Sequence, residues 1–532
     1  MSDLDWWRGA VIYQIYPRSF LDTNGNGVGD LPGITQQLDY VSDLGVDGIW
    51  ISPFFTSPMK DFGYDVSNYR DVDPLFGTLS DFDALLEKAH VLNLKIIIDL
   101  VLSHTSDQHP WFKQSCESRE NKKSNWYVWA DAKKDVQGKR IPPNNWVSVF
   151  GGPAWSYSEA REQYYLHNFL KEQPDLNFHN KDVQAEMLDI ARFWLERNVD
   201  GFRLDTVNFY FHDPLLRDNP PRETGTEYAT QFESDVPYSQ QQHIHDKSQQ
   251  ENFDFLKKLR ALMDQYPGTV TIGEIGDDDP YKLAQEYTRG QELLHTTYNP
   301  HMMSGTQKTL TEALIRKPIE TFYTQPDTPE YDVGWPSWAF SNHDVVRAAS
   351  RWLSPFAHDP ALSKMLIVLL GCLPGTGFLY QGEELGLPEA DIPFEDIQDP
   401  WAKETWPAWQ GRDGCRTPMP WRDEKYCGFS AHTPWLPIPK GHAPLSVQNQ
   451  NSNPESVLVF TRTFLKWRKK RQEIVKGGYK FYDTSNEYIL HLSRYNNKNK
   501  TGCIFNLSQK LLTYNGREIP PYGFLIDGFT VK

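Results

Sequence analysis

Residues 93–104, NLKIIIDLVLSH, decide the fold class. Their unbroken apolar core, with three successive isoleucines, is typical of a strand that is buried on both faces, as the inner strands of parallel sheets are. The preceding residues 81–92, DFDALLEKAHVL, repeat apolar side chains at helical spacing. A helix that leads directly into a buried strand is the repeating unit of a parallel α/β fold.

The same alternation of short apolar runs and helical stretches extends over most of the 532 residues. Eight strands that alternate with helices predict a closed (β/α)8 TIM barrel of the α/β class, rather than an open doubly wound sheet. The segments with the composition of strands are 10–17, 46–53, 93–104, 200–208, 268–276, 295–299, 335–343 and 375–384.

Three regions depart from this alternation. Residues 105–175 have little helical pattern and predict an irregular insertion after the third strand, and the polar residues 209–250 predict a long loop after the fourth. Beyond a helix near 456–473, alternating runs at 487–495 and 502–508 predict antiparallel strands. We therefore predict a barrel formed by 1–104 and 176–472, an inserted loop-rich domain B at 105–175, and a C-terminal antiparallel β domain at 473–532.

Composition argues against several classes of partner. The chain has 54 basic and 70 acidic side chains, a net charge of −16, whereas binding to nucleic acid or to an anionic membrane needs a basic face. The longest apolar run, 365–373, is far shorter than the roughly 20 residues of a membrane-spanning helix. The N-terminus carries acids where a signal peptide would be basic, and the five cysteines include no CxxC pair. We therefore expect a reduced, cytoplasmic protein.

Acidic side chains accumulate at the ends of the predicted strands, and a barrel of this kind carries its active site at the carboxyl ends of its strands. Any one acid could serve as a helix cap or an ion-pair partner. Four carboxylates on one rim are costly unless they are used, because like charges in a cleft raise one another's pKa. The residues are Asp99, Asp205, Glu274 and Asp344, with His104 and His343 beside them.

The fourth and fifth strands predict a division of labour between two of these acids. Arg203 and Asp205 are two residues apart, so in a strand they point to the same side, where the guanidinium would keep the carboxylate ionised. Glu274 is flanked by Ile272 and Ile275, and we expect drier surroundings that raise its pKa. A charged carboxylate beside a neutral carboxylic acid is typical of a glycosidase pair.

Nine ordered motifs between Trp6 and about Trp421 resemble glycoside hydrolase family 13, the α-amylase family, in its α-glucosidase and oligo-1,6-glucosidase branch. Five resemble the signature motifs of the whole family: DLVLSHTSDQHPWF, QPDLNF, GFRLDTVN, TIGEIG and FSNHDVVR. Four more resemble the branch: WWRGAVIYQIYPRSF, GYDVSNYRDVDPLFGT, LYQGEELG and GRDGCRTPMPW. Two positions depart from the usual pattern, because Ser103 stands where Asn is usual and Phe178 where Trp is common.

The resemblance implies a role for each matching residue. Asp205 matches the catalytic nucleophile, Glu274 the general acid/base, and Asp344 the third acid, which holds sugar hydroxyls and stabilises the transition state. Arg416 matches an arginine that clamps the non-reducing glucose, and Tyr64 a stacking platform. The other matches to the glucose-binding subsite are Asp65, His104, Arg203 and His343.

The implied activity is that of a retaining, exo-acting α-glucosidase, which needs no organic cofactor. In this branch a threonine at Thr206 accompanies preference for α-1,4 bonds, so we expect hydrolysis, and also transfer, of terminal glucose from short oligosaccharides such as maltose. The long loop at 209–250 is expected to wall off distant subsites. Three alternatives stay open: an oligo-1,6-glucosidase, a sucrose- or trehalose-remodelling transglucosylase, and an inactive amylase-like subunit. The oligomeric state is not predicted.

The segment DTNGNGVGD, residues 22–30, has oxygen-bearing side chains at alternate positions on a glycine-rich loop. This pattern resembles the first half of an EF-hand loop and predicts a structural Ca²⁺ or Mg²⁺ site, as similar α-glucosidases have here. A plain Asx turn is the alternative. The expected ligands are the side chains of Asp22, Asn24, Asn26 and Asp30 and the carbonyl of Val28. Cys415 has no base beside it in the sequence and is interpreted as a packed thiol.

Overall fold

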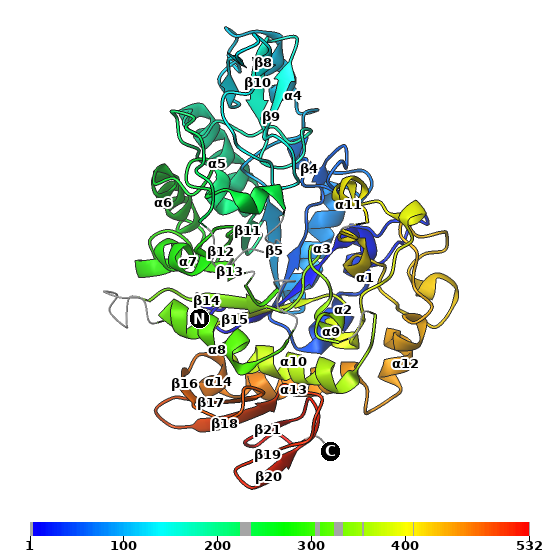
Figure 1. The fold of residues 1–532 in the computed structure, drawn as a ribbon. Helices are drawn as coiled ribbons and strands as arrows, with labels where there is room; N and C mark the ends of the chain where they lie inside the picture. The colour runs from blue at the N-terminus through cyan, green and yellow to red at the C-terminus, as the bar shows by residue number, and fades with distance from the viewer. Residues whose placement is uncertain are drawn as a thin grey trace. The chain divides into compact units, whose positions relative to one another are not determined.

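The computed structural model describes residues 4–223, 236–299, 301–303, 309–323, 333–353, 356–407 and 409–530. Its central feature is a closed barrel with the strand order β1-β15-β14-β13-β12-β11-β5-β2, labelled in Figure 1. The strands are β1 (Val11–Ile15), β2 (Gly48–Ile51), β5 (Lys95–Leu100), β11 (Gly201–Leu204), β12 (Val270–Glu274), β13 (Thr296–Asn299), β14 (Pro336–Ala339) and β15 (Thr376–Tyr380). Each lies within a predicted segment, so the predicted TIM barrel is confirmed.

Helices follow the barrel strands along the chain. They are α1 (Leu31–Gln36), α2 (Leu38–Leu44), α3 (Leu79–Val91), α5 (Lys181–Leu195), α6 (Glu251–Met263), α7 (Pro280–Thr288), α8 (Glu312–Tyr323), α9 (Ala348–Arg351), α10 (Pro360–Cys372), α11 (Pro400–Thr405), α12 (Val447–Asn451), α13 (Val457–Lys469) and α14 (Gln472–Val475). The chain divides into two compact units. The first comprises Met1–Ser52, Leu75–Ile97 and Tyr298–Lys532, and the second comprises Pro53–Pro74 and Ile98–Thr297.

Local sequence explains where these helices begin. Thr78 caps α3 in a capping box, in which its side chain accepts from the Asp81 backbone N–H and the Asp81 side chain accepts in return. Asn180 caps α5, and Asp359 caps α10 with a proline at the first helical position. In β5 the residues from Ile96 onward are buried, which agrees with the continuous apolar pattern that predicted an inner strand.

The pairing of β11 with β12 brings the ends of both strands to the same level. The two strands are parallel, with Arg203 opposite Ile272 and Leu204 opposite Gly273, so the next residues along each strand are Asp205 and Glu274. The close approach depends on Gly201, which has φ +155°. A Cβ atom at Gly201 would lie 2.2 Å from the carbonyl oxygen of Val270, a distance that a side chain cannot adopt.

Small sheets occupy the predicted insertion at 105–175. One sheet has the order β6-β10-β9 and a two-stranded sheet pairs β7 with β8, while α4 lies before them. Their core contains two stacked indoles, Trp146 and Trp155, with ring centres 5.9 Å apart. The bounds are α4 (Pro110–Glu117), β6 (Trp129–Ala130), β7 (Lys133–Lys134), β8 (Arg140–Ile141), β9 (Trp155–Ser158) and β10 (Gln163–Leu166). The short strands β3 (Phe55–Thr56) and β4 (Asn68–Val72) also pair in this unit. The domain borders themselves stay a prediction.

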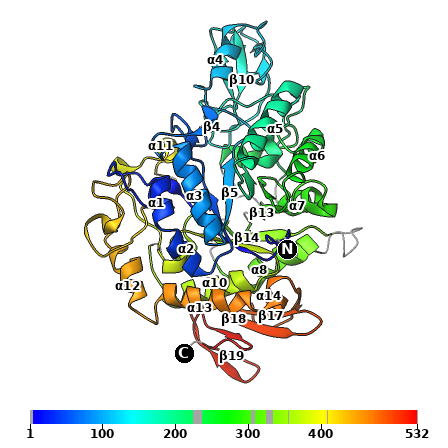
Figure 2. The same ribbon diagram turned by 180° about the vertical axis from the view of Figure 1, so that it is seen from behind.

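The C-terminal strands form an antiparallel sheet of order β16-β17-β18-β21, beside a separate pair, β19 and β20. In Figures 1 and 2 this sheet lies next to α13 and α14 of the same unit. Arg494 of β17 fastens it to α10, because its guanidinium donates to the carbonyl oxygens of Cys372 and Leu373 at the helix C-terminus. The bounds are β16 (Gly478–Tyr482), β17 (Ile489–Tyr495), β18 (Lys500–Asn506), β19 (Leu512–Tyr514), β20 (Arg517–Ile519) and β21 (Phe524–Ile526).

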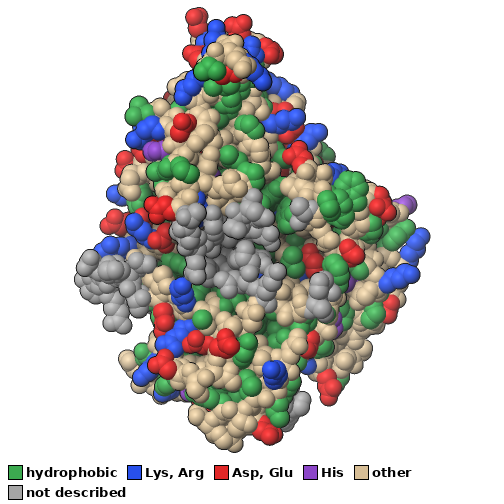
Figure 3. All heavy atoms as spheres, viewed as in Figure 1, with side chains coloured by type: hydrophobic (Ala, Val, Ile, Leu, Met, Phe, Trp, Pro, Cys, Tyr) green, Lys and Arg blue, Asp and Glu red, His purple; other side chains and the backbone are tan. Residues whose placement is uncertain are grey.

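On the face seen in Figure 3, basic and acidic side chains are interspersed. Among the described residues, no helix is both long enough and apolar enough to cross a membrane. The predicted loop at 209–250 is described at 209–223 and 236–250, while 224–235 lie outside the described residues.

Candidate active site

Arg203 is the centre of the acidic cluster in the second unit. Its Nη1 lies 2.8 Å from Asp99 Oδ1 and 2.5 Å from Asp205 Oδ1, and its Nη2 lies 2.6 Å from Glu274 Oε1. The guanidinium is 1% exposed, whereas Asp205 and Glu274 are 7% and 14% exposed. One buried cation therefore holds three carboxylates, two of which reach the surface of the site.

Burial and charge act in opposite directions on this cluster. Burial alone would lower the pKa of Arg203, but the surrounding carboxylates outweigh it and hold the pKa well above its ordinary value. Burial raises the pKa of Asp99, while Arg203 and a hydrogen bond from the Tyr64 hydroxyl, 3.0 Å from Oδ2, oppose that rise. Asp99 is thus the most deeply buried carboxylate of the cluster, with a side chain that is 0% exposed.

The surroundings of Glu274 differ from the prediction. The flanking apolar residues predicted a dry environment, but one carboxylate oxygen pairs with Arg203 and the other accepts from the backbone N–H of Thr206 at 3.1 Å. The strand pattern describes neighbours along the chain, whereas these two partners come from the end of the adjacent strand β11. The two polar partners of Glu274 were therefore not predicted from its flanking residues.

Thr206 also differs from its predicted geometry. The predicted strand 200–208 would place its side chain on the side opposite to Asp205, but β11 ends at Leu204 and Thr206 has φ +40° and ψ +50°, in the left-handed region. Its hydroxyl lies 3.4 Å from Asp205 Oδ2 and 3.0 Å from Ser103 Oγ. A β-branched residue in this conformation is strained, and such strain concentrates at functional sites. The hydroxyl thus belongs to the cluster itself.

His104 adjoins this cluster through Ser103, whose Oγ lies 2.8 Å from His104 Nδ1. Burial lowers the pKa of His104 to about 4, so the imidazole is neutral near pH 7. Its Nε2 lies 3.1 Å from the Tyr64 carbonyl oxygen and 3.2 Å from Gln173 Nε2. Ser103, one of the two departures from the family pattern, thus orients a predicted site residue. Phe178, the other departure, is buried and stacks on Tyr210.

Asp65 is held by its own loop rather than by Arg203. Its carboxylate accepts from Ser57 Oγ and from the backbone N–H groups of Lys60 and Asp61, all at 2.9–3.0 Å. Burial raises the pKa of Asp65 to about 6, although these hydrogen bonds lower it in part. These hydrogen bonds join Asp65 to its own loop and not to the Arg203 cluster, and its place in the glucose-binding subsite stays a prediction.

The remaining predicted residues form a second cluster, in the first unit. Asp344 is 24% exposed, and its Oδ1 lies 2.7 Å from Arg416 Nη2 and 3.4 Å from Arg412 Nη1. His343 Nε2 lies 3.3 Å from Asp344 Oδ2, and its ring stacks on Tyr16 with centres 5.5 Å apart. Arg416 also donates through Nε to the His343 carbonyl oxygen at 2.6 Å. Arg416 thus fixes both the backbone and the side chain of this motif.

Cys415 lies inside this second cluster as a packed thiol, in agreement with its interpretation from the sequence. It is buried, and its Sγ donates to the Arg412 carbonyl oxygen at 3.0 Å. Burial holds the pKa of the thiol well above its ordinary value, so Cys415 stays protonated and is not a nucleophile.

The candidate metal loop consists of overlapping turns. Asp22 accepts from the backbone N–H groups of Asn24, Gly25 and Gly27, and Asp30 accepts from Gly33 as the cap of α1. Neither carboxylate forms an ion pair with lysine or arginine in the described parts of the chain, and those parts contain no cluster of three His, Cys, Asp or Glu side chains suited to a metal. The donors are all oxygens, the type that Ca²⁺ and Mg²⁺ take. The hydrogen bonds from backbone N–H groups to the Asp22 side chain are also those expected of a plain Asx turn.

Two charged residues of the second cluster were missed at the sequence level. Arg412 stands four residues before Arg416 in the motif GRDGCRTPMPW, and this i,i+4 repetition of arginine is a signal that could have identified it. Its partner Asp399, at 2.9 Å, lies 13 residues earlier in the sequence and carries no motif of its own.

Comparisons with known proteins agree with this geometry. The family description "Alpha amylase, catalytic domain" matches residues 14–477. The protein named "probable alpha-glucosidase" of Rhizobium meliloti (strain 1021) is 52% identical over 519 residues, 97% of this chain and 92% of the relative. The oligo-1,6-glucosidase of Parageobacillus thermoglucosidasius is 35% identical over 534 residues, 95% of this chain and 91% of the relative.

Two solved structures extend the likeness to the whole fold. A crystal structure of an α-glucosyl transfer enzyme has a TM-score of 0.90 at 50% identity and covers 98% of this chain and 97% of its own. The trehalulose synthase of Pseudomonas mesoacidophila has a TM-score of 0.86 at 29% identity and covers 98% and 99%. The chain therefore belongs to the α-amylase family of glycoside hydrolases, in its α-glucosidase branch.

Proposed function

We propose that this chain is a retaining, exo-acting α-glucosidase that removes terminal non-reducing α-1,4-linked glucose from short substrates such as maltose. The observation that carries the proposal is that Asp205 and Glu274 bind neighbouring nitrogens of the single guanidinium of Arg203. Two carboxylates held that close leave little room for water between them, and retaining glycosidases keep theirs only about 5 Å apart.

In the proposed reaction Asp205 attacks the anomeric carbon while the glycosidic C–O bond breaks and its oxygen takes a proton from Glu274. Glu274, now a carboxylate, takes a proton from water, whose oxygen displaces Asp205 from the same carbon. Two inversions return α-glucose. Asp344 is proposed to hold sugar hydroxyls in the transition state, and its cluster of Arg416, His343 and Arg412 supports that role by fixing the carboxylate.

NMR of the product tests the proposal directly. Wild-type enzyme on maltose should release α-glucose as the first anomer, and β-glucose would overturn the retaining mechanism. Asp205→Asn should lose several orders of magnitude in kcat yet melt near the wild-type temperature. Glu274→Gln should lose far more activity on maltose than on an aryl glucoside with an activated leaving group, because only maltose needs the proton. Glu87→Gln, an exposed carboxylate on α3, is the matched control and should be unchanged on both substrates.

Transfer of glucose to a second sugar is a further proposed activity. It is supported by the 50% identity to an α-glucosyl transfer enzyme and by the fact that transfer uses the same two carboxylates, with a sugar hydroxyl in place of water. Product analysis at rising maltose concentration measures it, since transfer should increase with acceptor while glucose release per bond cleaved falls. An inactive amylase-like subunit is disfavoured because all three acids are present.

The loop at 22–30 is proposed to bind a structural Ca²⁺ or Mg²⁺ ion through Asp22, Asn24, Asn26, Asp30 and the Val28 carbonyl. The proposal is supported by the oxygen-bearing side chains at alternate positions of this glycine-rich loop, the donor type that Ca²⁺ and Mg²⁺ take. EDTA should lower the melting temperature and added Ca²⁺ or Mg²⁺ should restore it, whereas Asp22→Asn should respond to neither. A wild-type melting temperature that ignores EDTA and both ions would favour the plain Asx turn.

We also propose that the protein acts in a reducing compartment such as the cytoplasm. All five cysteines are unpaired thiols, and four of them are buried. Disulfides form and persist in oxidising compartments and are rare in the cytosol, so a chain with five thiols supports a reducing compartment. Fractionation of the source cells, with activity followed on maltose, tests this location.

A further inference from the structure

Asp344 receives two arginines, and each of them is held in a different way. Arg416 is fixed by the backbone of the same motif, through its bond from Nε to the His343 carbonyl oxygen. Arg412 reaches the same carboxylate, because its Nη1 lies 3.4 Å from Asp344 Oδ1. Arg412 is also held by a partner outside this motif.

That partner is Asp399. Arg412 donates from Nη2 to Asp399 Oδ1 at 2.9 Å and from Nε to Asp399 Oδ2 at 3.0 Å, and its backbone N–H also donates to Oδ2 at 2.9 Å. This bidentate pairing adds geometric specificity as well as energy, so it fixes the orientation of the guanidinium. Both side chains are buried, at 5% and 0% exposed, so solvent does not screen the pair.

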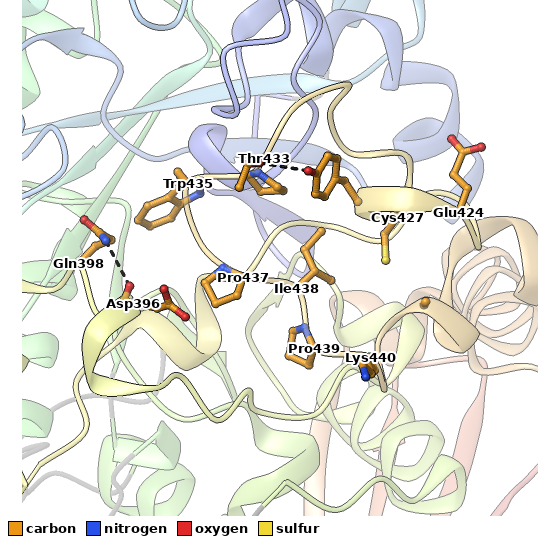
Figure 4. Close-up of a pocket in the computed structure, with 13 residues that line it drawn as sticks. Asp396, Gln398, Glu424, Cys427, Thr433, Trp435, Pro437, Ile438, Pro439 and Lys440 are labelled. Atoms are coloured by element: carbon orange, nitrogen blue, oxygen red, sulfur yellow. Dashed lines mark hydrogen bonds between the residues drawn. The ribbon is translucent and has the colours of Figure 1, made fainter.

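Asp399 is itself fixed on both sides. Its backbone N–H and that of Gln398 donate to Asp413 Oδ2 at 2.9 and 2.6 Å, and its own Oδ1 caps α11 at Trp401. Figure 4 shows the preceding residues Asp396 and Gln398 at the edge of a surface pocket, where the Gln398 amide bonds back to Asp396. Of the two acids in this short segment, Asp396 is exposed and Asp399 is buried.

The charges of the pair bear on what Arg412 does to Asp344. Burial would raise the pKa of Asp399, but Arg412 and then Arg416 outweigh burial and hold the pKa below its ordinary value. Asp399 is therefore ionised at neutral pH and cancels the charge of Arg412. Arg412 then orients Asp344 by donating a hydrogen bond to its carboxylate, while Arg416 is the arginine that balances the negative charge of Asp344.

We propose that Asp399 is a positioning residue for the reaction: through Arg412 it fixes the carboxylate of Asp344 for the sugar hydroxyls. The proposal rests on the proposed role of Asp344 as the third acid. Loss of the Asp399 charge would release Arg412, which would bind Asp344 more tightly and in a less defined geometry. Because Asp344 acts mainly in the transition state, the loss would appear in kcat more than in KM.

The test is a double-mutant cycle of Asp399→Asn and Arg412→Gln, with kcat and KM measured on maltose and melting temperature measured in parallel. Each single variant should lose roughly 10- to 100-fold in kcat with KM changed less than about threefold. The kcat of the double variant should be no lower than that of the less active single variant. Asp399→Glu should recover part of kcat. Asp396→Asn, the exposed acid three residues earlier, is the matched control and should match wild type.

Multiplicative losses in the double variant would overturn the proposal, as would wild-type kcat in folded Asp399→Asn. If Asp399→Asn fails to fold, Asp399→Glu and Arg412→Lys provide the cycle instead. Asp344→Asn is measured beside them: an active Asp344→Asn refutes the third-acid role, whereas an inactive Asp344→Asn with an active Asp399→Asn refutes only the role of Asp399.

Discussion

Replacement of Arg203 gives the most quantitative test of the acidic cluster. The guanidinium contacts three carboxylates at 2.5–2.8 Å, so Arg203→Met removes the only described cation that pairs with Asp205 and Glu274 together. A unit charge at about 4 Å in surroundings of effective dielectric constant near 20 is worth about 4 kcal/mol, or about three pH units for one carboxylate, as an upper limit. Loss of one oriented donor in an active site also costs about 10²- to 10³-fold in kcat.

The direction follows from the sign of the charge. Without the cation each carboxylate is easier to protonate, so the ionised nucleophile is lost at a higher pH. The acidic limb of the pH profile of kcat/KM should therefore shift to higher pH by about one to three units. Arg203→Lys keeps the positive charge but loses the planar guanidinium that binds several carboxylates at once. It should therefore lower kcat while shifting the acidic limb of the pH profile less than Arg203→Met does. Rates on maltose between pH 4 and 9 measure both effects. Arg192→Met is the control, because this arginine of α5 has a side chain that is 42% exposed and pairs with the surface acid Asp189. An unmoved limb in folded Arg203→Met would refute the electrostatic reasoning.

Three further predictions concern linkage, assembly and pH. Thr206→Val removes the hydroxyl that lies between Asp205 and Ser103, so the preference for maltose over isomaltose should narrow by roughly 10-fold or more in kcat/KM, and an unchanged ratio would dismiss the role of Thr206. Arg494→Ala leaves the carbonyls of Cys372 and Leu373 without their donor, so unfolding free energy should fall by about 3 kcal/mol in urea titrations, whereas a loss below about 0.5 kcal/mol would contradict the contact. Burial raises the pKa of Asp175 from 3.8 to about 8, so the folded state binds the proton more tightly than the unfolded state, and the free energy of unfolding should fall as pH rises between these values. In Asp175→Asn the melting temperature should depend less on pH over this range. An unchanged pH dependence would argue against the raised pKa of Asp175.

The parts of the fold that the sequence predicted are those that short patterns determine. Eight strands were found because buried parallel strands have continuous apolar runs, and β5 is the clearest of them. The pairing of Arg203 with Asp205 followed from their spacing of two residues. The environment of Glu274 did not follow, because its partners belong to the neighbouring strand and depend on the register that Gly201 permits.

Sequence patterns did not predict features that depend on the backbone conformation of one residue or on residues far apart in the chain. Thr206 is β-branched and belongs statistically in a strand, yet the chain turns through the left-handed region there because β11 has already ended. Asp399 and Arg412 are 13 residues apart, a spacing that matches no helical or strand periodicity between them. The acid at Asp65 matched its motif, but the motif does not show that its loop would satisfy it internally.

The two clusters differ in their balance of charge, and the difference suits the work proposed for each. In the second unit one guanidinium faces the carboxylates of Asp99, Asp205 and Glu274, so acids outnumber the cation. In the first unit two arginines face Asp344 and Asp399, and the charges cancel. Glycoside cleavage passes through an oxocarbenium-like, positively charged transition state, which an excess of oriented carboxylates stabilises and an excess of arginines would oppose. Asp344, held by arginines whose charge Asp399 helps to balance, can then bind neutral hydroxyls without adding positive charge to the reaction.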